Sequence, residues 1–230
     1  MEHRFSRTEM VVGSKGLKRL EATTVAVVGI GGVGGYVVEA LVRSGIGSLI
    51  LIDHDRVSLT NLNRQIIALE STLGRPKVEV MAERIYQINP ACRIQTFAEF
   101  YQATNHETFL PSGVDFVADA IDSVGPKVSL IERCLKDGVP IISSLGTGNK
   151  LDPTRLTITD IATTHTCPLA RAVRVSLRKR GIDGGVPVVF SPEQVVGMRD
   201  GAVPGSTSFV PPVAGLFMAS WIIRRICEED

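Results

Sequence analysis

The stretch Gly29-Ile-Gly-Gly-Val-Gly-Gly35 decides the predicted fold of this chain. Apolar residues 25–28 lead into it, and residues 36–43, which have a helical pattern, follow it. A second apolar run at residues 49–52 then ends at Asp53. A strand, a glycine-rich turn, a helix, a strand and an acidic residue, in this order, are typical of a nucleotide-binding βαβ unit. The glycines let the backbone approach a phosphate, and the free N–H groups at the start of the helix attract the phosphate charge.

The composition is that of an ordinary globular protein. A chain of 230 residues is long enough to bury a large core, and its 44% hydrophobic and 21% charged residues are typical values. The net charge of +1 argues against a surface that is basic throughout, although not against a local basic patch. The four cysteines form no CxxC pair. The sequence therefore predicts no zinc knuckle and no disulfide framework, and a reducing cytoplasm is the expected location.

Beyond residue 53, alternating strand and helix patterns extend the βαβ unit. Strands are predicted at 93–97, 114–118 and 139–143, and helices at 77–89 and 128–136. We therefore predict a doubly wound, mostly parallel α/β sheet, a Rossmann-like fold, over residues 1–145. Residues 146–230 have a less regular pattern and are predicted to form the substrate-binding portion of the same continuous domain. This portion has predicted strands at 155–160 and 186–190, a basic helix at 168–180 and a mobile loop at 198–208.

The last apolar segment, residues 209–226, is the one candidate for a membrane span. Pro211 and Pro212 lie at its start, and Arg224 and Arg225 interrupt it. Its apolar part is shorter than the roughly 20 residues that a membrane-spanning helix needs. We expect a helix that is buried or lies at an interface rather than one that spans a membrane.

Polar and charged residues just beyond the βαβ unit favour ATP over a dinucleotide. They occur in the segments Asp53-His-Asp55, Asn61-Leu-Asn-Arg-Gln65 and Gly74-Arg-Pro-Lys77. A dehydrogenase needs no such cluster beyond its ribose-binding carboxylate. An enzyme that cleaves a triphosphate must neutralise about four negative charges in the transition state. The cluster therefore predicts that the chain binds ATP and cleaves it between the α and β phosphates.

Individual side chains in this cluster have predicted roles. Asp53 is placed to accept the ribose hydroxyls, and Asp55 to hold Mg²⁺ or to order the basic residues. Arg64 and Lys77 are the cations expected on the phosphates. Asp122 follows the strand at 114–118, at the sheet edge where ligands bind, and is the predicted Mg²⁺ ligand. The full set of predicted nucleotide-binding residues is Gly29, Gly31, Gly32, Gly34, Asp53, Asp55, Asn61, Asn63, Arg64, Gln65 and Lys77.

These segments together resemble the adenylating superfamily of ubiquitin-activating-type enzymes, which includes ThiF, MoeB and HesA. The resemblance covers about residues 4–145 and includes Arg4-Phe-Ser-Arg7 and Ala120-Ile-Asp-Ser123 beside the segments above. It implies that a substrate carboxylate attacks the α-phosphate of ATP, giving an acyl-adenylate and pyrophosphate. It also implies that Arg64, Lys77 and Asp122 carry the chemistry of ATP and Mg²⁺, so that residues 1–145 form an adenylating core. Arg7 would reach across a homodimer into the active site of the partner subunit.

The second half of the chain narrows the resemblance to one subfamily. Carrier-protein members usually have two CxxC pairs for zinc, which this chain lacks, and Ser123 stands where they often have asparagine. Four segments resemble the tRNA threonylcarbamoyladenosine dehydratases: Asp160-Ile161, Pro168-Leu-Ala-Arg-Ala-Val-Arg-Val-Ser-Leu-Arg-Lys-Arg-Gly181, Val188-Val-Phe-Ser-Pro-Glu193 and Gly205-Ser-Thr-Ser-Phe-Val-Pro211. The resemblance implies ATP-dependent cyclisation of threonylcarbamoyladenosine in tRNA through an acyl-adenylate of the threonyl carboxylate. The neighbouring carbamoyl group closes the ring at high effective molarity.

Two features of residues 167–180 have alternative interpretations. Arg171, Arg174 and Arg178 share one helix face, which is either a solvated surface or a set of tRNA phosphate contacts. Cys167 precedes the helix, where a thiol pKa can be lowered. Because no His–Asp pairing is evident beside it, we favour a helix-start residue without chemistry over a reactive thiol.

Two other functions compete with tRNA modification. The first is adenylation of the C-terminal Gly-Gly of a sulfur-carrier or ubiquitin-like protein, against which the missing zinc pairs and the basic helix weigh. The second is a NAD(P)-dependent oxidoreductase, which only the glycine stretch supports. The sequence does not identify the substrate tRNAs, and it leaves open whether a sulfur-relay protein takes part.

Overall fold

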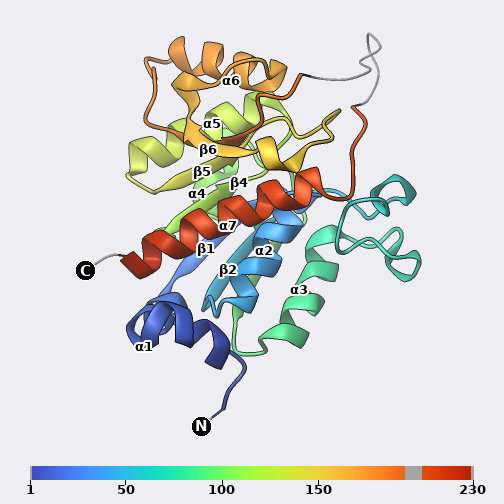
Figure 1. The fold of residues 1–230 in the computed structure, drawn as a ribbon, viewed down its shortest axis with the longest axis vertical. Helices are drawn as coiled ribbons and strands as arrows, with labels where there is room; N and C mark the ends of the chain where they lie inside the picture. The colour runs from blue at the N-terminus through green and yellow to red at the C-terminus, as the bar shows by residue number, and fades with distance from the viewer. Residues whose placement is uncertain (1, 195–203, 229–230) are drawn as a thin grey trace.

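One seven-stranded sheet organises residues 2–194 and 204–228, which the computed structural model describes (Figure 1). The strand order is β3-β2-β1-β4-β5-β7-β6, and the neighbouring strands are parallel except for the antiparallel pair β6 and β7. The predicted doubly wound, mostly parallel sheet is therefore confirmed. The strands are β1 (Thr24–Val28), β2 (Ser48–Ile52), β3 (Arg93–Phe97), β4 (Phe116–Asp119), β5 (Ile141–Ser144), β6 (Thr157–Asp160) and β7 (Pro187–Phe190).

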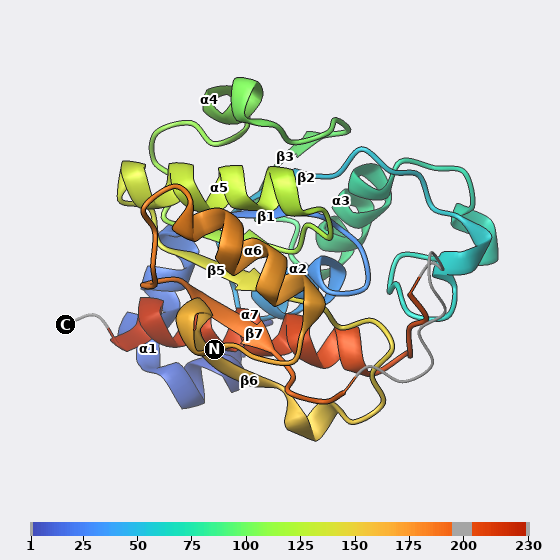
Figure 2. The same cartoon turned by 90° about the horizontal axis from the view of Figure 1, so that it is seen from above.

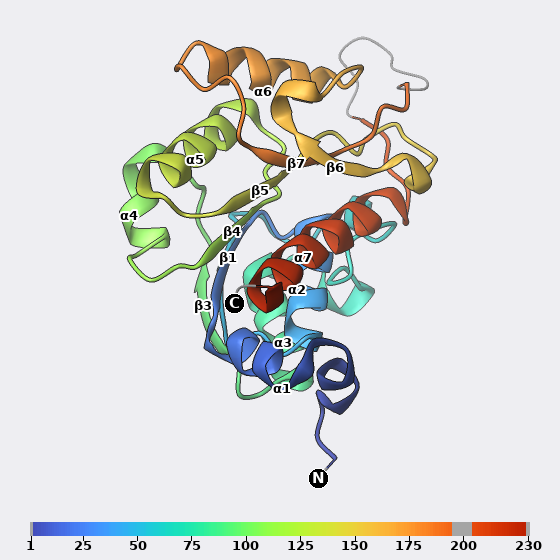
Figure 3. The same ribbon diagram turned by 60° about the vertical axis from the view of Figure 1, so that its left-hand side comes forward.

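Helices cover both faces of this sheet (Figures 2 and 3). One face carries α1 (Ser6–Ala22), α2 (Gly34–Arg43), α3 (Lys77–Ile88) and α7 (Val210–Glu228). The other carries α4 (His106–Phe109), α5 (Val124–Asp137) and α6 (Pro168–Arg178). Side chains alternate between the two faces of a strand, so each face has its own core. In β1, Val25 and Val27 pack with α2 and α7, whereas Ala26 and Val28 pack with α5 and α6.

The N-terminal helix α1 was not predicted from the sequence. Gly13 interrupts its helical pattern and has a φ of 74°, so the helix is kinked there. Its second half is held by the other end of the chain, because Arg19 Nη1 donates to the carbonyl oxygen of Cys227 at 3.1 Å. Leu17 and Leu20 of this half are buried. The helix α5 is also longer than predicted and begins at Val124, since proline is tolerated in a first helical turn.

The sheet continues past residue 145, because β7 pairs with β5 and β6 pairs with β7. The division into an adenylating core (1–145) and a substrate-binding portion (146–230) stays a prediction. Residues 198–203 of the predicted loop lie outside the described residues, and residues 204–208 contain no helix or strand.

The C-terminal helix α7 returns to pack on α2 and α1 (Figure 3). The packing on α2 is close: a Cβ atom at Gly215 would lie 2.3 Å from the carbonyl oxygen of Val33. With 19 residues and a mean hydropathy of 1.2, α7 is long and apolar enough for a membrane span, but half of that window is buried inside the protein. The helix is thus part of the core on this face, as we expected of residues 209–226.

Candidate active site

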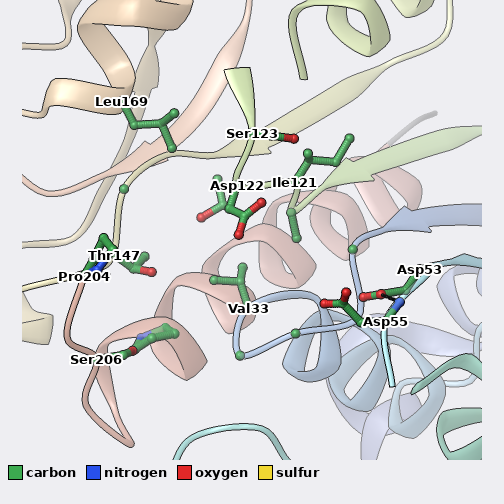
Figure 4. Close-up of a pocket in the computed structure, with 18 of the residues that line it drawn as sticks. Val33, Asp53, Asp55, Ile121, Asp122, Ser123, Thr147, Leu169, Pro204 and Ser206 are labelled. Carbon is green, nitrogen blue, oxygen red and sulfur yellow. Dashed lines mark hydrogen bonds between the residues drawn. The ribbon is translucent and has the colours of Figure 1, made fainter. Parts of the chain in front are cut away.

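A cavity of about 530 Å³ lies at the carboxyl ends of the parallel strands (Figure 4). It opens where β1 and β4 lie side by side, with α2 after β1 on one face and α5 after β4 on the other. This is the switch point at which open α/β sheets bind ligands. Its walls come from the turn after β1, the ends of β2, β4 and β5, the start of α6, and residues 204–206.

The glycine turn between β1 and α2 forms the floor of the cavity. Gly29 has a φ of 92°, in the left-handed region that favours glycine. Gly31 and Gly32 line the cavity, whereas Gly34 lies beneath the turn. A Cβ atom at Gly34 would lie 1.7 Å from the carbonyl oxygen of Gly29, so only glycine fits there. The turn therefore exposes backbone rather than side chains to a ligand.

Asp53 links the glycine turn to the end of β2. Its Oδ2 accepts a hydrogen bond from the Ile30 N–H at 2.6 Å, and its Oδ1 accepts one from the Asp55 N–H at 2.8 Å. The residue is buried but lines the cavity. Because each carboxylate oxygen can accept more than one hydrogen bond, Asp53 can still accept a ligand hydroxyl.

Lys77, the first residue of α3, lies against the two aspartates. Its Nζ is 2.6 Å from Asp55 Oδ2 and 4.0 Å from Asp53 Oδ2, and its side chain is only 6% exposed. Asp53, His54 and Asp55 have ligand atoms close enough together for a metal ion. The Lys77 ammonium group forms an ion pair with Asp55. Asp55 thus contacts a basic residue, and its two predicted roles, to hold Mg²⁺ or to order the basic residues, stay predictions.

The segment between β2 and α3 places further predicted residues at the cavity. Arg64 lines it, with Nη1 donating to the Thr60 carbonyl at 2.9 Å and to Asn63 Oδ1 at 2.8 Å. Asn61 also lines it, and its Oδ1 accepts from the Ser58 N–H at 3.1 Å. Asn63 does not line the cavity, because its amide donates to the Ser206 carbonyl at 2.9 Å.

Gln65 has an unused acceptor in the cavity wall. The residue is 7% exposed, and its buried Oε1 has no hydrogen-bond partner among residues 2–194 and 204–228. Buried polar atoms are nearly always hydrogen-bonded in folded proteins. This oxygen is therefore available to accept a hydrogen bond from a ligand in the cavity.

Asp122 projects into the cavity from the segment that follows β4 (Figure 4). It is exposed, and none of the described side chains forms a hydrogen bond or an ion pair with it. A free carboxylate in a polar cavity suits Mg²⁺, which takes one or two protein oxygens and keeps most of its waters. The residues present thus fit the predicted metal at Asp122.

Sequence reasoning missed a buried ion pair directly behind Asp122. Lys127 and Asp119 are both completely buried, and Lys127 Nζ lies 2.6 Å from Asp119 Oδ2. Burial lowers the pKa of Lys127, while the charge of Asp119 opposes that shift. The sequence signal was slight, an acidic residue ending an apolar strand with a lysine eight residues later. The far wall of the cavity, which contains Thr147, Lys150 and Pro204, was also missed.

Four other candidate residues lie away from the cavity. Arg7 is exposed on α1, and the segment just before this helix lies beside the end of α3, since Arg4 Nη1 donates to the Ile88 carbonyl. Arg171 and Arg178 are exposed on α6. Arg174 differs from them: its Nη1 donates to the carbonyl oxygen and to Oγ1 of Thr164 at 2.8 and 2.6 Å.

Cys167 caps the start of α6. Its Sγ accepts from the Ala170 N–H at 3.5 Å, and the residue is 2% exposed although it lines the cavity. The described geometry gives this thiol the helix-start role that we favoured.

Comparison with known proteins assigns the chain to a family. A model of the ThiF family matches residues 5–230. The chain belongs to the ThiF family. Within the chain, the ThiF-family match extends over the glycine turn, the cavity and all seven strands of the sheet.

Relatives of this ThiF-family chain include curated enzymes. The tRNA threonylcarbamoyladenosine dehydratase of Bacillus subtilis (strain 168) is 44% identical, with 100% of this chain and 96% of that protein covered. A solved structure of the E. coli tRNA N6-threonylcarbamoyladenosine dehydratase in complex with ATP has a TM-score of 0.91 at 40% identity, and covers 97% of this chain and 93% of that one. The molybdopterin-synthase adenylyltransferase of Haemophilus influenzae is more distant, at 34% identity over 62% of this chain and 59% of that protein. The predicted resemblance to the adenylating superfamily is therefore confirmed.

Proposed function

We propose that this ThiF-family enzyme is a tRNA threonylcarbamoyladenosine dehydratase that uses ATP. The observation that carries the proposal is the match to a dehydratase along the whole chain at 44% identity, whereas adenylyltransferases of the carrier-protein type match at 30–34% identity. The cavity supports it independently, because the glycine turn and two cationic side chains meet at the switch point of the sheet. Structures of the E. coli dehydratase with ATP and with AMP support a nucleotide in this position.

The proposed reaction has two steps. A threonyl carboxylate oxygen attacks the α-phosphorus of ATP, an acyl–O–P bond forms, and pyrophosphate leaves. The carbamoyl group of the same modified adenosine then attacks the activated carbonyl carbon, AMP leaves, and one proton is released. The oxygen lost by the threonyl carboxylate thus leaves with AMP and the hydrogen leaves as the released proton, so that the substrate becomes lighter by one water. The second step is intramolecular, so its nucleophile is already at high effective molarity.

We assign the nucleotide contacts to the residues that line the cavity. Asp53 accepts ribose hydroxyls, the backbone of Gly31 and Gly32 approaches the phosphates, and Gln65 Oε1 accepts a hydrogen bond from the nucleotide. Arg64 and Lys77 neutralise the triphosphate, and ATP takes over part of the role that Asp55 has beside Lys77. Asn63 supports this set indirectly through Arg64 and Ser206.

Mg²⁺ is the proposed metal, with Asp122 as its protein ligand. When bound, it neutralises phosphate charge and orients the pyrophosphate leaving group. Asp122 directs one carboxylate toward the phosphates, and its exposed position leaves room for the waters that Mg²⁺ keeps.

The proposed assembly is a cytoplasmic homodimer in which Arg7 acts across the interface. Arg7 does not line the cavity of its own subunit, so it can contact ATP only from a second copy. Adenylation of a carrier-protein Gly-Gly is the alternative function. More distant matches favour it: the adenylyltransferase and sulfurtransferase MOCS3 of Drosophila willistoni, at 30% identity over 90% of this chain, and the molybdopterin-synthase enzyme. We also keep the prediction that a sulfur-relay protein binds this enzyme, and we assign no binding surface to it.

The proposed function predicts a specific product. Incubation of the protein with ATP, Mg²⁺ and tRNA that contains threonylcarbamoyladenosine should convert that nucleoside to a form lighter by one water. Mass analysis of the digested tRNA measures this change. Parallel incubations without ATP, or with NAD in its place, serve as controls. Unchanged nucleoside together with ATP-dependent adenylation of a Gly-Gly carrier tail would establish the alternative function instead.

The basic face of α6 predicts a salt-dependent contact with tRNA. Because Arg174 is held by Thr164, we assign the phosphate contacts of the predicted stripe to Arg171 and Arg178, which are exposed; Arg178 Nε lies 4.0 Å from Asp183 Oδ1. Arg171→Gln with Arg178→Gln should weaken tRNA binding and reduce the slope of log affinity against log salt by up to about two units. Filter binding at several salt concentrations measures the slope. Lys15→Gln with Lys18→Gln, on the other face of the sheet, is the matched control and should leave the slope unchanged. An equal slope in both double variants would make the α6 face an ordinary solvated surface.

A further inference from the structure

A buried ammonium group behind the cavity has no part in the reaction described above. Lys127 lies in the first turn of α5 and is 0% exposed. Its Nζ donates to Asp119 Oδ2 at 2.6 Å, to Ser143 Oγ at 3.0 Å and to the Ser144 carbonyl at 2.9 Å. The Ser143 hydroxyl in turn donates to Asp119 Oδ2 at 2.6 Å. All three donors of the ammonium group therefore have a partner.

Two of the hydrogen-bond partners of Lys127 are the last residues of strands β4 and β5, and the chain after each strand forms a wall of the cavity. Asp119 ends β4, and its Oδ1 accepts from the Ile121 N–H at 3.0 Å. Ile121 adjoins Asp122, and both line the cavity. Ser144 ends β5, and the wall of residues 145–150 begins directly after it. One ammonium group thus joins the ends of two strands to the start of a helix.

Stability alone is a poor account of this ion pair. The desolvation of two buried charges offsets most of their attraction, and well-packed apolar residues are often equally stable in such a place. An ion pair differs from apolar packing because its hydrogen bonds have fixed directions. Here those directions lead to Asp119 and from Asp119 to the backbone N–H of Ile121. The network therefore links Lys127 to the segment that carries Asp122.

We propose that Lys127 is a positioning residue for adenylation, which holds Asp122 in place through Asp119 and the backbone of Ile121. The inference rests on the proposed function, because that function gives Asp122 its role. A displacement of about 1 Å at a reacting group can lower a rate about a hundredfold. The contacts of Arg64 and Lys77 come from other elements, so loss of Lys127 should lower kcat much more than it changes the KM for ATP.

The test removes both charges together, so that no lone buried charge remains. In the double variant K127M/D119N, the asparagine side chain keeps an acceptor for the Ile121 N–H, and the methionine fills the space of the lysine stem. Pyrophosphate release with ATP, Mg²⁺ and substrate tRNA gives kcat and KM separately. We expect kcat to fall about tenfold to a hundredfold while the KM for ATP changes less than about threefold.

The matched control is a second, partly buried ion pair whose residues do not line the cavity. Arg84 on α3 donates to Glu39 on α2 through two hydrogen bonds of 2.7 and 2.9 Å, and neither residue lines the cavity. The variant R84M/E39Q should lose stability and keep its kcat. Circular dichroism establishes that both double variants are folded. If K127M/D119N does not fold, Ser143→Ala replaces it, because that change keeps both buried charges and removes the hydroxyl that bonds to Lys127 and Asp119. The expected fall in kcat for Ser143→Ala is about threefold to tenfold.

Asp122→Asn separates positioning from a general structural effect. If Lys127 acts through Asp122, K127M/D119N should lower kcat far less in the Asp122→Asn background than in the wild type. If K127M/D119N lowers kcat by the same factor with and without Asp122→Asn, the inference is wrong. It is also wrong if K127M/D119N, or Ser143→Ala in its place, is folded and has the kcat of the wild type. These results require an active wild-type enzyme. A wild-type protein that releases no pyrophosphate with the substrate tRNA would refute the proposed function, and the inference with it.

Discussion

Replacing either phosphate-facing cation should abolish adenylation while the protein stays folded. Lys77→Ala and Arg64→Ala each remove a charge that we propose neutralises the triphosphate in the transition state, and the expected loss in kcat is at least about a hundredfold to a thousandfold. Pyrophosphate release at saturating tRNA measures the loss. Neither side chain belongs to the two hydrophobic cores. The Asp55 left behind by Lys77→Ala is half exposed, so water can solvate it.

Arg56→Ala is the matched control for both variants. Arg56 lies in the same segment and also donates to a backbone carbonyl, that of Gly74 at 2.9 Å, but it does not line the cavity. Its activity should stay within about twofold of the wild type, as for most surface substitutions. Normal pyrophosphate release by Lys77→Ala or Arg64→Ala would remove that residue from the proposed phosphate site.

Mixing two inactive variants should restore about a quarter of the wild-type activity. In a homodimer with composite sites, Arg7→Ala and Lys77→Ala protomers form heterodimers that contain one site with both residues intact. Half of the dimers in an equal, well-exchanged mixture are heterodimers, and each has one working site of two. The structure supports this arrangement because Arg7 lies on α1, away from the cavity of its own subunit.

The mixing experiment is measured by pyrophosphate release after exchange of subunits. A mixture of Arg64→Ala with Lys77→Ala is the control, because both residues belong to the same subunit's site and every dimer then lacks a complete one. No recovery in the Arg7→Ala mixture, with exchange verified by a tagged protomer, would mean that Arg7 does not act across the interface.

The glycine turn and the strands around it were predictable because their signals are local. Asp53, Arg64, Lys77 and Asp122 were predicted to share one site, and all four line the same cavity. Asp53 and Asp122 follow the ends of strands β2 and β4. Arg64 and Lys77 lie between the end of β2 and the first residue of α3, so the order of the elements brings all of them to one edge of the sheet.

The features that were not predictable depend on contacts between distant parts of the chain. The helix α1 is stabilised at Arg19 by Cys227, 208 residues later. Lys127 meets Ser144 only because β4 and β5 are neighbours in the sheet. The helical pattern put Arg174 on one face with Arg171 and Arg178, but could not show that Thr164 would hold its guanidinium group.

The contact between α7 and the glycine turn means that the protein is not built from two exchangeable modules. A Cβ atom at Gly32 would lie 3.3 Å from Pro211 Cβ, and Gly215 lies against the Val33 carbonyl. The end of the chain is thus as much a part of the nucleotide site as the motif near its beginning. Recombination or truncation that separated the two would leave the turn without its support. The region that distinguishes this subfamily in sequence therefore also supports the glycine turn near the start of the chain.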